Sequence, residues 1–179
     1  MALLDVNHIY THATKGGLIA TPTDNQGVFL KSSGSDFDWS FFKANMVKGE
    51  CPVYSDTATA NDILISLRFT NQLKLNLNDR FDIYFAQEPV RARRLTIVGI
   101  FDTQLQEVDE TLVICDIRHI QRLNGWMYNQ ITGFEVNIEH MDQLEGLEEK
   151  ISKLVEYKIY DDGSRLSVST IDSRFPHLF

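Results

Sequence analysis

The sequence predicts an α+β fold. Stretches that alternate apolar and polar residues, typical of half-buried strands, are interspersed with stretches whose apolar residues recur at helical spacing. The two kinds do not follow the regular strand–helix alternation of a parallel α/β sheet, and two of the strands are predicted to form a hairpin. The 179 residues, 43% of them hydrophobic, suffice for a compact core, and no repeat or low-complexity run indicates a solenoid or disorder.

The first third of the chain is expected to hold three short strands and a helix. The strands are expected at residues 7–12, 18–20 and 28–31. Lys15-Gly16-Gly17 is expected to separate the first strand from the second. Asp38 is positioned to cap a short helix that directs Phe41, Phe42 and Met46 inward. The aromatic residues of this helix are therefore predicted to belong to the core and not to a cofactor site.

The middle of the chain contains a capped helix and the hairpin. Ser66 follows the apolar strand 63–65 and is predicted to be the N-cap of the next helix. Residues 80–85 alternate apolar and polar side chains, and residues 95–101 are rich in branched ones. These two strands are predicted to pair as a hairpin whose tip is Ala86–Arg94.

The last third is expected to combine strands with two helices. Asp116 follows a strand at 111–114 and is predicted to cap a helix that ends near Asn124, where Gly125 suits a left-handed backbone. A strand at 134–138 and a final strand at 166–170 are expected around a further helix. Asp142 and Glu145 have the spacing of a capping box at the start of this helix. Its apolar face is predicted to consist of Leu144, Leu147, Ile151, Leu154 and Val155.

Charge and cysteine content exclude several classes of function. The net charge of -8 and the pI near 5.0 argue against nucleic acid or an anionic lipid surface as the main partner. No signal peptide is visible, and no apolar run approaches the ~20 residues of a membrane helix. Cys51 and Cys115 lack the spacing of a zinc or redox motif, and Cys115 is expected to be a buried, unpaired thiol.

A search for catalytic and metal-binding patterns finds no strong signature. His8 and His12 could chelate a metal on a helix, but on a strand they lie ~13 Å apart. The acidic cluster Glu107, Asp109 and Glu110 is expected to be a solvated loop. His119, between Arg118 and Arg122, is expected on a surface helix face. No metal, cofactor or catalytic residue is therefore predicted.

The hairpin tip concentrates positive charge in an otherwise acidic chain. Its candidate partner-binding residues are Gln87, Glu88, Pro89, Val90, Arg91, Arg93 and Arg94. Two interpretations stay open. The charges either keep a strand edge from aggregating, or they form a recognition surface, since arginine is favoured at protein interfaces.

Several segments occur in an order that resembles the MacB-like periplasmic core domains of FtsX-like ABC-transporter permeases, and most closely those of the lipoprotein-releasing LolC and LolE group. They are Gln26–Lys31 with Asp36–Phe42, Val47-Lys48-Gly49, Asp62–Ser66 with Leu77-Asn78-Asp79, Leu95–Phe101, Leu112-Val113-Ile114 with Ile120–Leu123, and Thr132–Val136. The resemblance covers residues 6 to 171.

The resemblance implies a porter-like α/β subdomain interrupted by a Sabre-like mixed β/α subdomain with a protruding hairpin. The porter-like parts would be residues 1–31 and 130–179, and the Sabre-like insertion residues 32–129. The porter part would lack the strand and helix with which the family usually begins. Ala86–Arg94 would occupy the place of the hook, the hairpin that recruits a carrier in the lipoprotein-releasing members, although it is shorter.

The resemblance also implies a role, a place and partners. The chain would be a periplasmic domain of an inner-membrane protein in a Gram-negative bacterium, without its membrane helices, and would not be an enzyme. Its partners would be the ATP-binding subunit that acts through the membrane part, a sister permease subunit or a second copy, and a periplasmic lipoprotein carrier with its lipoprotein substrate.

Three alternatives remain. A MacB-type efflux or FtsX-type signalling permease would have the same fold and a different partner. An enzyme using Asp102, Glu107, Asp109 and Glu110 would need a closed pocket and a shifted pKa. A free-standing ligand-binding protein would need a continuous apolar cavity of several hundred Å³, as such sites usually have.

Overall fold

The computed structural model describes residues 6–22, 24–138, 140–156, 158–160 and 163–170. These divide into two compact units. The larger one comprises residues 10–135, and the smaller one comprises residues 1–9 and 136–179. The larger unit contains almost all of the buried hydrophobic side chains and the hairpin.

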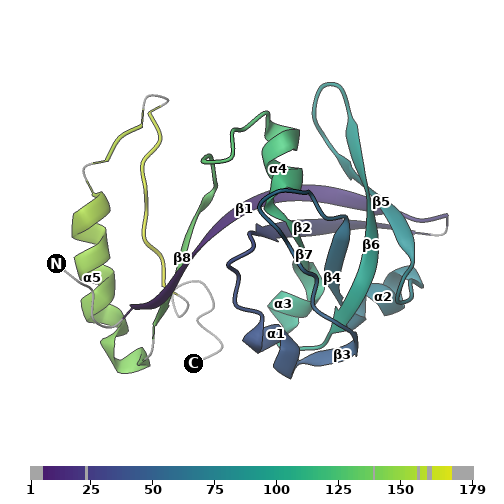
Figure 1. The fold of residues 1–179 in the computed structure, drawn as a ribbon, viewed down its shortest axis with the longest axis horizontal. Coiled ribbons are helices and arrows are strands. Elements are labelled where there is room, and N and C mark those ends of the chain that lie inside the picture. The colour runs from purple at the N-terminus through teal and green to yellow at the C-terminus, as the bar shows by residue number, and fades with distance from the viewer. Residues whose placement is uncertain (1–5, 23, 139, 157, 161–162, 171–179) are drawn as a thin grey trace. The chain divides into compact units, whose positions relative to one another are not determined.

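Six strands of the larger unit close into a barrel (Figure 1). They are β1 (Val6–Ala20), β2 (Asn25–Ser33), β4 (Asp62–Ser66), β5 (Arg80–Phe85), β6 (Arg91–Phe101) and β7 (Leu112–Asp116). Around the barrel the order is β1-β2-β7-β4-β6-β5 and back to β1; β2–β7 and β4–β6 are parallel and the other pairs antiparallel. Two more strands attach to it: β3 (Met46–Gly49) pairs with β6, and β8 (Gly133–Ile138) follows β1 in the strand order.

The lengths of the strand pairings differ widely around the barrel. β1 and β2 share nine residue pairs and β5 and β6 share six, whereas β1 and β5 share three and β4 and β7 only two. The barrel therefore consists of two well-paired sheets, β1-β2-β7 and β4-β6-β5, that meet along two short seams.

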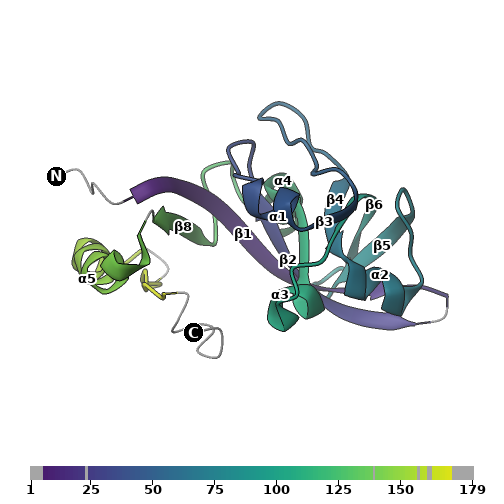
Figure 2. The same cartoon turned by 90° about the horizontal axis from the view of Figure 1, so that it is seen from below.

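The expected break at Lys15-Gly16-Gly17 is wrong, because β1 continues through it. Figure 2 shows β1 as one uninterrupted strand. The three residues pair with Leu30, Phe29 and Val28 of β2, and this long-range pairing outweighs the local preference of glycine for turns. Gly17 points inward, where a Cβ would lie 2.7 Å from Ile83 Cγ2. Glycine is thus needed there for close packing and not for a turn.

The barrel interior is filled with side chains. Ile19, Leu30, Ile63, Ile83 and Ile97 are fully buried in one cluster, and each comes from a different strand. Strand alternation places every second residue of these strands in this cluster. A second cluster outside β4 and β7 joins Leu64, Phe101 and Ile114 to Phe42. The barrel is therefore a packed core and not a ligand cavity.

Four short helices belong to the larger unit. They are α1 (Ser40–Ala44), α2 (Leu67–Leu73), α3 (Gln106–Thr111) and α4 (Ile117–Asn124). The predicted caps of α2 and α4 are confirmed: the Ser66 side chain accepts a hydrogen bond from the Phe69 amide, the Asp116 side chain accepts one from the Arg118 amide, and Gly125 has a φ of 67°.

The predicted α1 is shorter than its aromatic content suggested. The Asp38 carboxylate accepts a hydrogen bond from the Ser40 amide at the start of α1, and Phe42 is buried. Phe41, expected in the core, is 47% exposed, since a five-residue helix has room for little more than one buried position.

The smaller unit contains the first residues of β1, the end of β8, a 3-10 turn at Met141–Gln143 and helix α5 (Leu144–Val155). The expected capping box is wrong, because α5 begins after Gln143 and no side-chain cap is formed. The expected strand at 166–170 is also wrong: residues 163–170 form only a single bridge, between Arg165 and Ile159.

The two compact units are not the porter-like and Sabre-like parts that the resemblance implies. Residues 10–31 and 130–135 lie in the larger unit, because β1 and β2 are two of the barrel strands. The porter-like and Sabre-like division stays a prediction.

Candidate functional site

The hairpin predicted as the partner-binding element is present, but its tip is shorter than expected. Strand β6 begins at Arg91, so the loop is only residues 86–90. Arg91, Arg93 and Arg94 pair with Phe85, Ile83 and Asp82 of β5. Three of the seven candidate residues thus have their directions fixed by a strand.

Strand alternation places Arg94 on the opposite side of β6 from Arg91 and Arg93. Arg94 forms a bidentate pair with Asp82, from Nε to Oδ1 at 2.9 Å and from Nη2 to Oδ2 at 2.8 Å. The pair lowers the pKa of the Asp82 carboxyl and raises that of the Arg94 guanidinium. Arg94 is therefore neutralised within the hairpin itself.

Arg91 and Arg93 lie on the side of β6 that carries the buried Leu95. Burial lowers the pKa of Arg93, and repulsion from Arg91 and from Arg122 of α4 lowers it further. None of the ion pairs in the described part of the chain involves these three residues. We call Arg91, Arg93 and Arg122 the arginine cluster.

The tip is attached to α4 through Gln87, whose Nε2 donates to the Leu123 carbonyl at 3.2 Å. A second bond at this end of α4 runs from Lys15 Nζ to Asn124 Oδ1 at 2.7 Å. Glu88, Pro89 and Val90 are exposed. The structure therefore holds Gln87, Arg91 and Arg93 beside α4 and leaves the apex of the hairpin to solvent.

His119 is not on a surface face, contrary to the prediction. It is 4% exposed, and its Nε2 lies 2.8 Å from the Ala60 carbonyl oxygen. Burial lowers its pKa, and the positive charges of Arg93 and Arg122 act in the same direction. The sequence held a signal for this, since His119 and the buried Leu123 are four residues apart and share one helix face.

The acidic residues expected in a solvated loop form helix α3 instead. Asp109 is 6% exposed, and its Oδ1 accepts hydrogen bonds from Thr103 N at 3.1 Å and Thr103 Oγ1 at 2.8 Å. Glu110 pairs with Arg68 of α2. Their partners give Asp109 and Glu110 structural roles.

Neither the histidine pair nor the cysteines form a site. His8 and His12 lie on β1 as expected, and no three His, Cys, Asp or Glu side chains within the described ranges are placed to hold a metal ion. Cys51 and Cys115 are free thiols, and burial raises the pKa of both.

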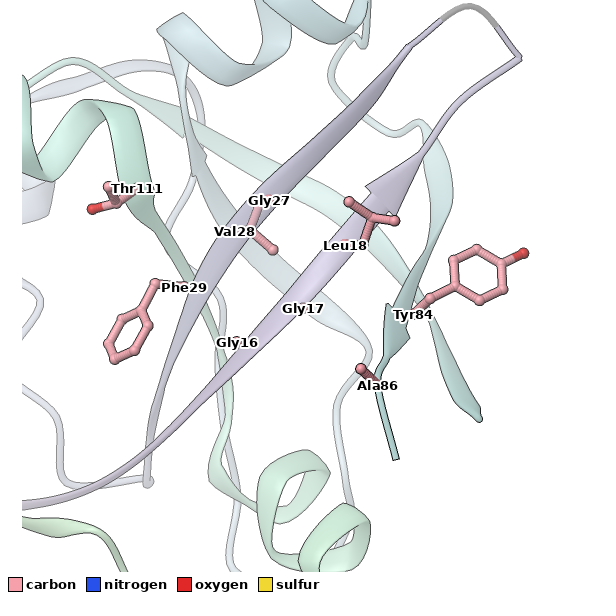
Figure 3. A pocket seen from close by; sticks show the side chains of 9 residues that line it. All are labelled: Gly16, Gly17, Leu18, Gly27, Val28, Phe29, Tyr84, Ala86 and Thr111. Carbon is pink, nitrogen blue, oxygen red and sulfur yellow. The ribbon is translucent and has the colours of Figure 1, made fainter. Parts of the chain in front are cut away.

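An apolar hollow of about 480 Å³ lies on the outside of the barrel over β1, β2 and β5 (Figure 3). Leu18, Phe29 and Tyr84 border it, each about two-fifths exposed, and nothing lies within 4 Å of the Cβ positions of Gly16 and Gly27. No titratable carboxylate, imidazole or thiol lines it. It is an open surface hollow and not the continuous cavity that a free-standing ligand-binding protein would need.

Within the described residues, no helix has the length and apolarity to cross a membrane.

No family model and no curated protein matches the chain. Several solved structures resemble it, and two of them are informative about its fold. The extracellular domain of the noncanonic ABC-type transporter YknZ from Gram-positive bacteria has a TM-score of 0.55 and 14% identity, over 86% of this chain and 76% of that one. The periplasmic region of MacB from Actinobacillus actinomycetemcomitans has a TM-score of 0.51 and 11% identity, over 84% and 68%. The chain therefore has the α+β fold of the extracytoplasmic domains of YknZ and MacB, as the sequence predicted.

Proposed function

We propose that this chain is the extracytoplasmic domain of an ABC-transporter permease, where it binds partner proteins and transmits ATP-driven motion, and that it is not an enzyme. The observation that carries the proposal is the fold shared with the YknZ and MacB domains.

The barrel suits a part that transmits motion. All six of its strands are paired on both sides along part of their length, and its interior is close-packed. Such a core deforms little under load, so a displacement at one end moves the hairpin at the other. The hairpin then presents the arginine cluster to whatever lies outside the membrane.

Within this class we propose lipoprotein release from the inner membrane of a Gram-negative bacterium. The ordered segments that resemble the LolC and LolE group support this, and the same resemblance would put the hairpin in the place of the carrier-recruiting hook. An ATP-binding subunit, a sister permease subunit or second copy, and a lipoprotein carrier would be its partners. A MacB-type efflux or FtsX-type signalling permease is the second candidate, favoured by the likeness to the MacB domain.

The test is depletion of the gene product in its own cells, followed by fractionation of the membranes. Lipoprotein release predicts that outer-membrane lipoproteins accumulate in the inner membrane, and that the wild-type gene restores their sorting. A gene in which residues 87–90 are replaced by a glycine-serine turn should fail to restore it. Sensitivity to exported toxic compounds with normal sorting would favour efflux. No defect in either assay would refute a role in export.

A further inference from the structure

We propose that the arginine cluster, Arg91 and Arg93 of β6 with Arg122 of α4, is a docking site for a carboxylate-rich segment of a partner protein. The partner's membership of an export system rests on the proposed function. The chemistry it must have, clustered Asp and Glu side chains, rests on the cluster alone.

The cluster is assembled by tertiary structure and not by sequence proximity. Arg122 is far from the hairpin in the chain, and the bond from Gln87 Nε2 to the Leu123 carbonyl fixes the tip beside this end of α4. Arg93 is half-buried at this junction. The one hydrogen bond of its guanidinium within the described contacts goes to the Ala92 carbonyl, at 2.9 Å, which leaves most of its five N–H donors for a ligand.

The positive charge of the arginine cluster is not balanced by any of the described ion pairs. The chain has 25 acidic and 17 basic residues, so carboxylates to neutralise an arginine are abundant. Lys31, Arg68, Arg94 and Lys153 each pair with one. The cluster instead brings like charges together: the pKa of Arg93 is lowered first by burial and then by repulsion from Arg91 and Arg122. Carboxylates supplied from outside would remove that repulsion and form charge-assisted, bidentate hydrogen bonds.

The C-terminal end of α4 explains only part of the cluster. Helix carbonyls at this end favour a cation, which accounts for Arg122 in the last turn. They do not account for two further arginines from a separate strand, because Gly125 N and Trp126 N already bond to the carbonyls of Arg122 and Gln121.

An exposed apolar side chain beside the cluster favours a protein over a small anion. Val90, next to Arg91, is 68% exposed. Arginine beside an exposed aliphatic side chain suits a protein interface, where arginine is enriched and apolar contacts supply part of the affinity.

The first experiment measures binding of a fluorescein-labelled oligoglutamate peptide to the chain by fluorescence anisotropy at about 0.15 M salt, where the Debye length is ~8 Å. We expect Arg91→Gln/Arg93→Gln/Arg122→Gln to weaken binding at least about tenfold, which corresponds to ~1.4 kcal/mol. The control Lys48→Gln/Arg68→Gln/Arg80→Gln removes the same charge away from the arginine cluster and should change binding less than about twofold, as expected for screened, distant charges. Equal losses in the two variants would mean that only net charge matters and would overturn the proposal.

A second measurement places the ligand, using the His119 ring resonances in NMR. Arg93 and Arg122 disfavour protonated His119, so the peptide should raise the pKa of His119 in the wild type. The cluster variant should start with a raised pKa and show no further change. Inorganic phosphate, or vesicles containing phosphatidylglycerol, that bind as tightly as the peptide would overturn the assignment to a protein segment. A negative sorting assay would refute the export function and leave these results intact.

Discussion

Replacing Gly17 with valine is expected to destabilise the barrel, whereas the same change at the neighbouring Gly16 is not. A Cβ at Gly17 would lie 2.7 Å from Ile83 Cγ2 and 3.2 Å from Phe85 Cε1. Both side chains are fully buried, so neither can swing into solvent. Overpacking of this kind costs about 1–3 kcal/mol, and the two further methyl groups of valine put the cost near the upper end.

At Gly16 the same substitution is expected to raise the stability and not to lower it. No atom lies within 4 Å of its Cβ position. Valine there should stabilise the strand by ~0.5–1 kcal/mol, because glycine loses more chain entropy on folding. The two variants should differ by about 3.5–4 kcal/mol, or about 7–16 °C in Tm for a chain of this length.

Thermal unfolding followed by circular dichroism compares the two variants. A further variant, Gly17→Val/Ile83→Ala, removes the methyl group that clashes, so its loss of stability should be less than the sum of the two single losses. Equal Tm values for Gly16→Val and Gly17→Val would refute the continuous strand. A turn at this position, as the local sequence suggested, would treat the two glycines alike.

Three other changes test separate parts of the structure. Asp116→Ala should lower the free energy of unfolding by about 2 kcal/mol in urea, because it removes both the cap of α4 and the acceptor of the Ala60 amide, 2.9 Å away; Asp116→Asn should retain most of it. His119 is held neutral in the fold by a lowered pKa, so stability should fall as pH drops below the unfolded value of ~6.5; in urea titrations His119→Gln should flatten that slope, and an unchanged slope would contradict the burial of this ring. Cys115 should react with a thiol reagent only at the rate of unfolding, because it is fully buried and its pKa is raised; reaction as fast as that of Cys51 would contradict this.

Elements that depend on neighbouring residues were predictable from the sequence. The caps at Ser66 and Asp116 and the left-handed Gly125 are each fixed by hydrogen bonds or backbone angles within a few residues. The pairing of β5 with β6 follows from a short connection between two alternating segments. Closure of the barrel was not predictable, because it depends on β1 pairing with β5, which lies far along the chain.

The candidate site was likewise predictable only in part. The opposite directions of Arg93 and Arg94 follow from the period of two in β6, which the sequence already contains once the strand is extended to Arg91. The contribution of Arg122 depends on how α4 lies against the hairpin, and no local pattern carries that information. The burial of His119 differs, because its helical spacing from the buried Leu123 was a local signal that the prediction did not use.

The two short seams of the barrel determine where it would yield under strain. The two sheets are joined by only two and three residue pairs at the seams, so under force they should separate there before the pairing within either sheet is lost. The β4–β7 seam is fastened from outside, where the buried Tyr54 hydroxyl lies 3.2 Å from the Asp62 carbonyl oxygen and 3.4 Å from that of Ile114. The Tyr54 side chain thus connects the two strands of this seam. A force that separates the strands would act first on the contacts of this ring.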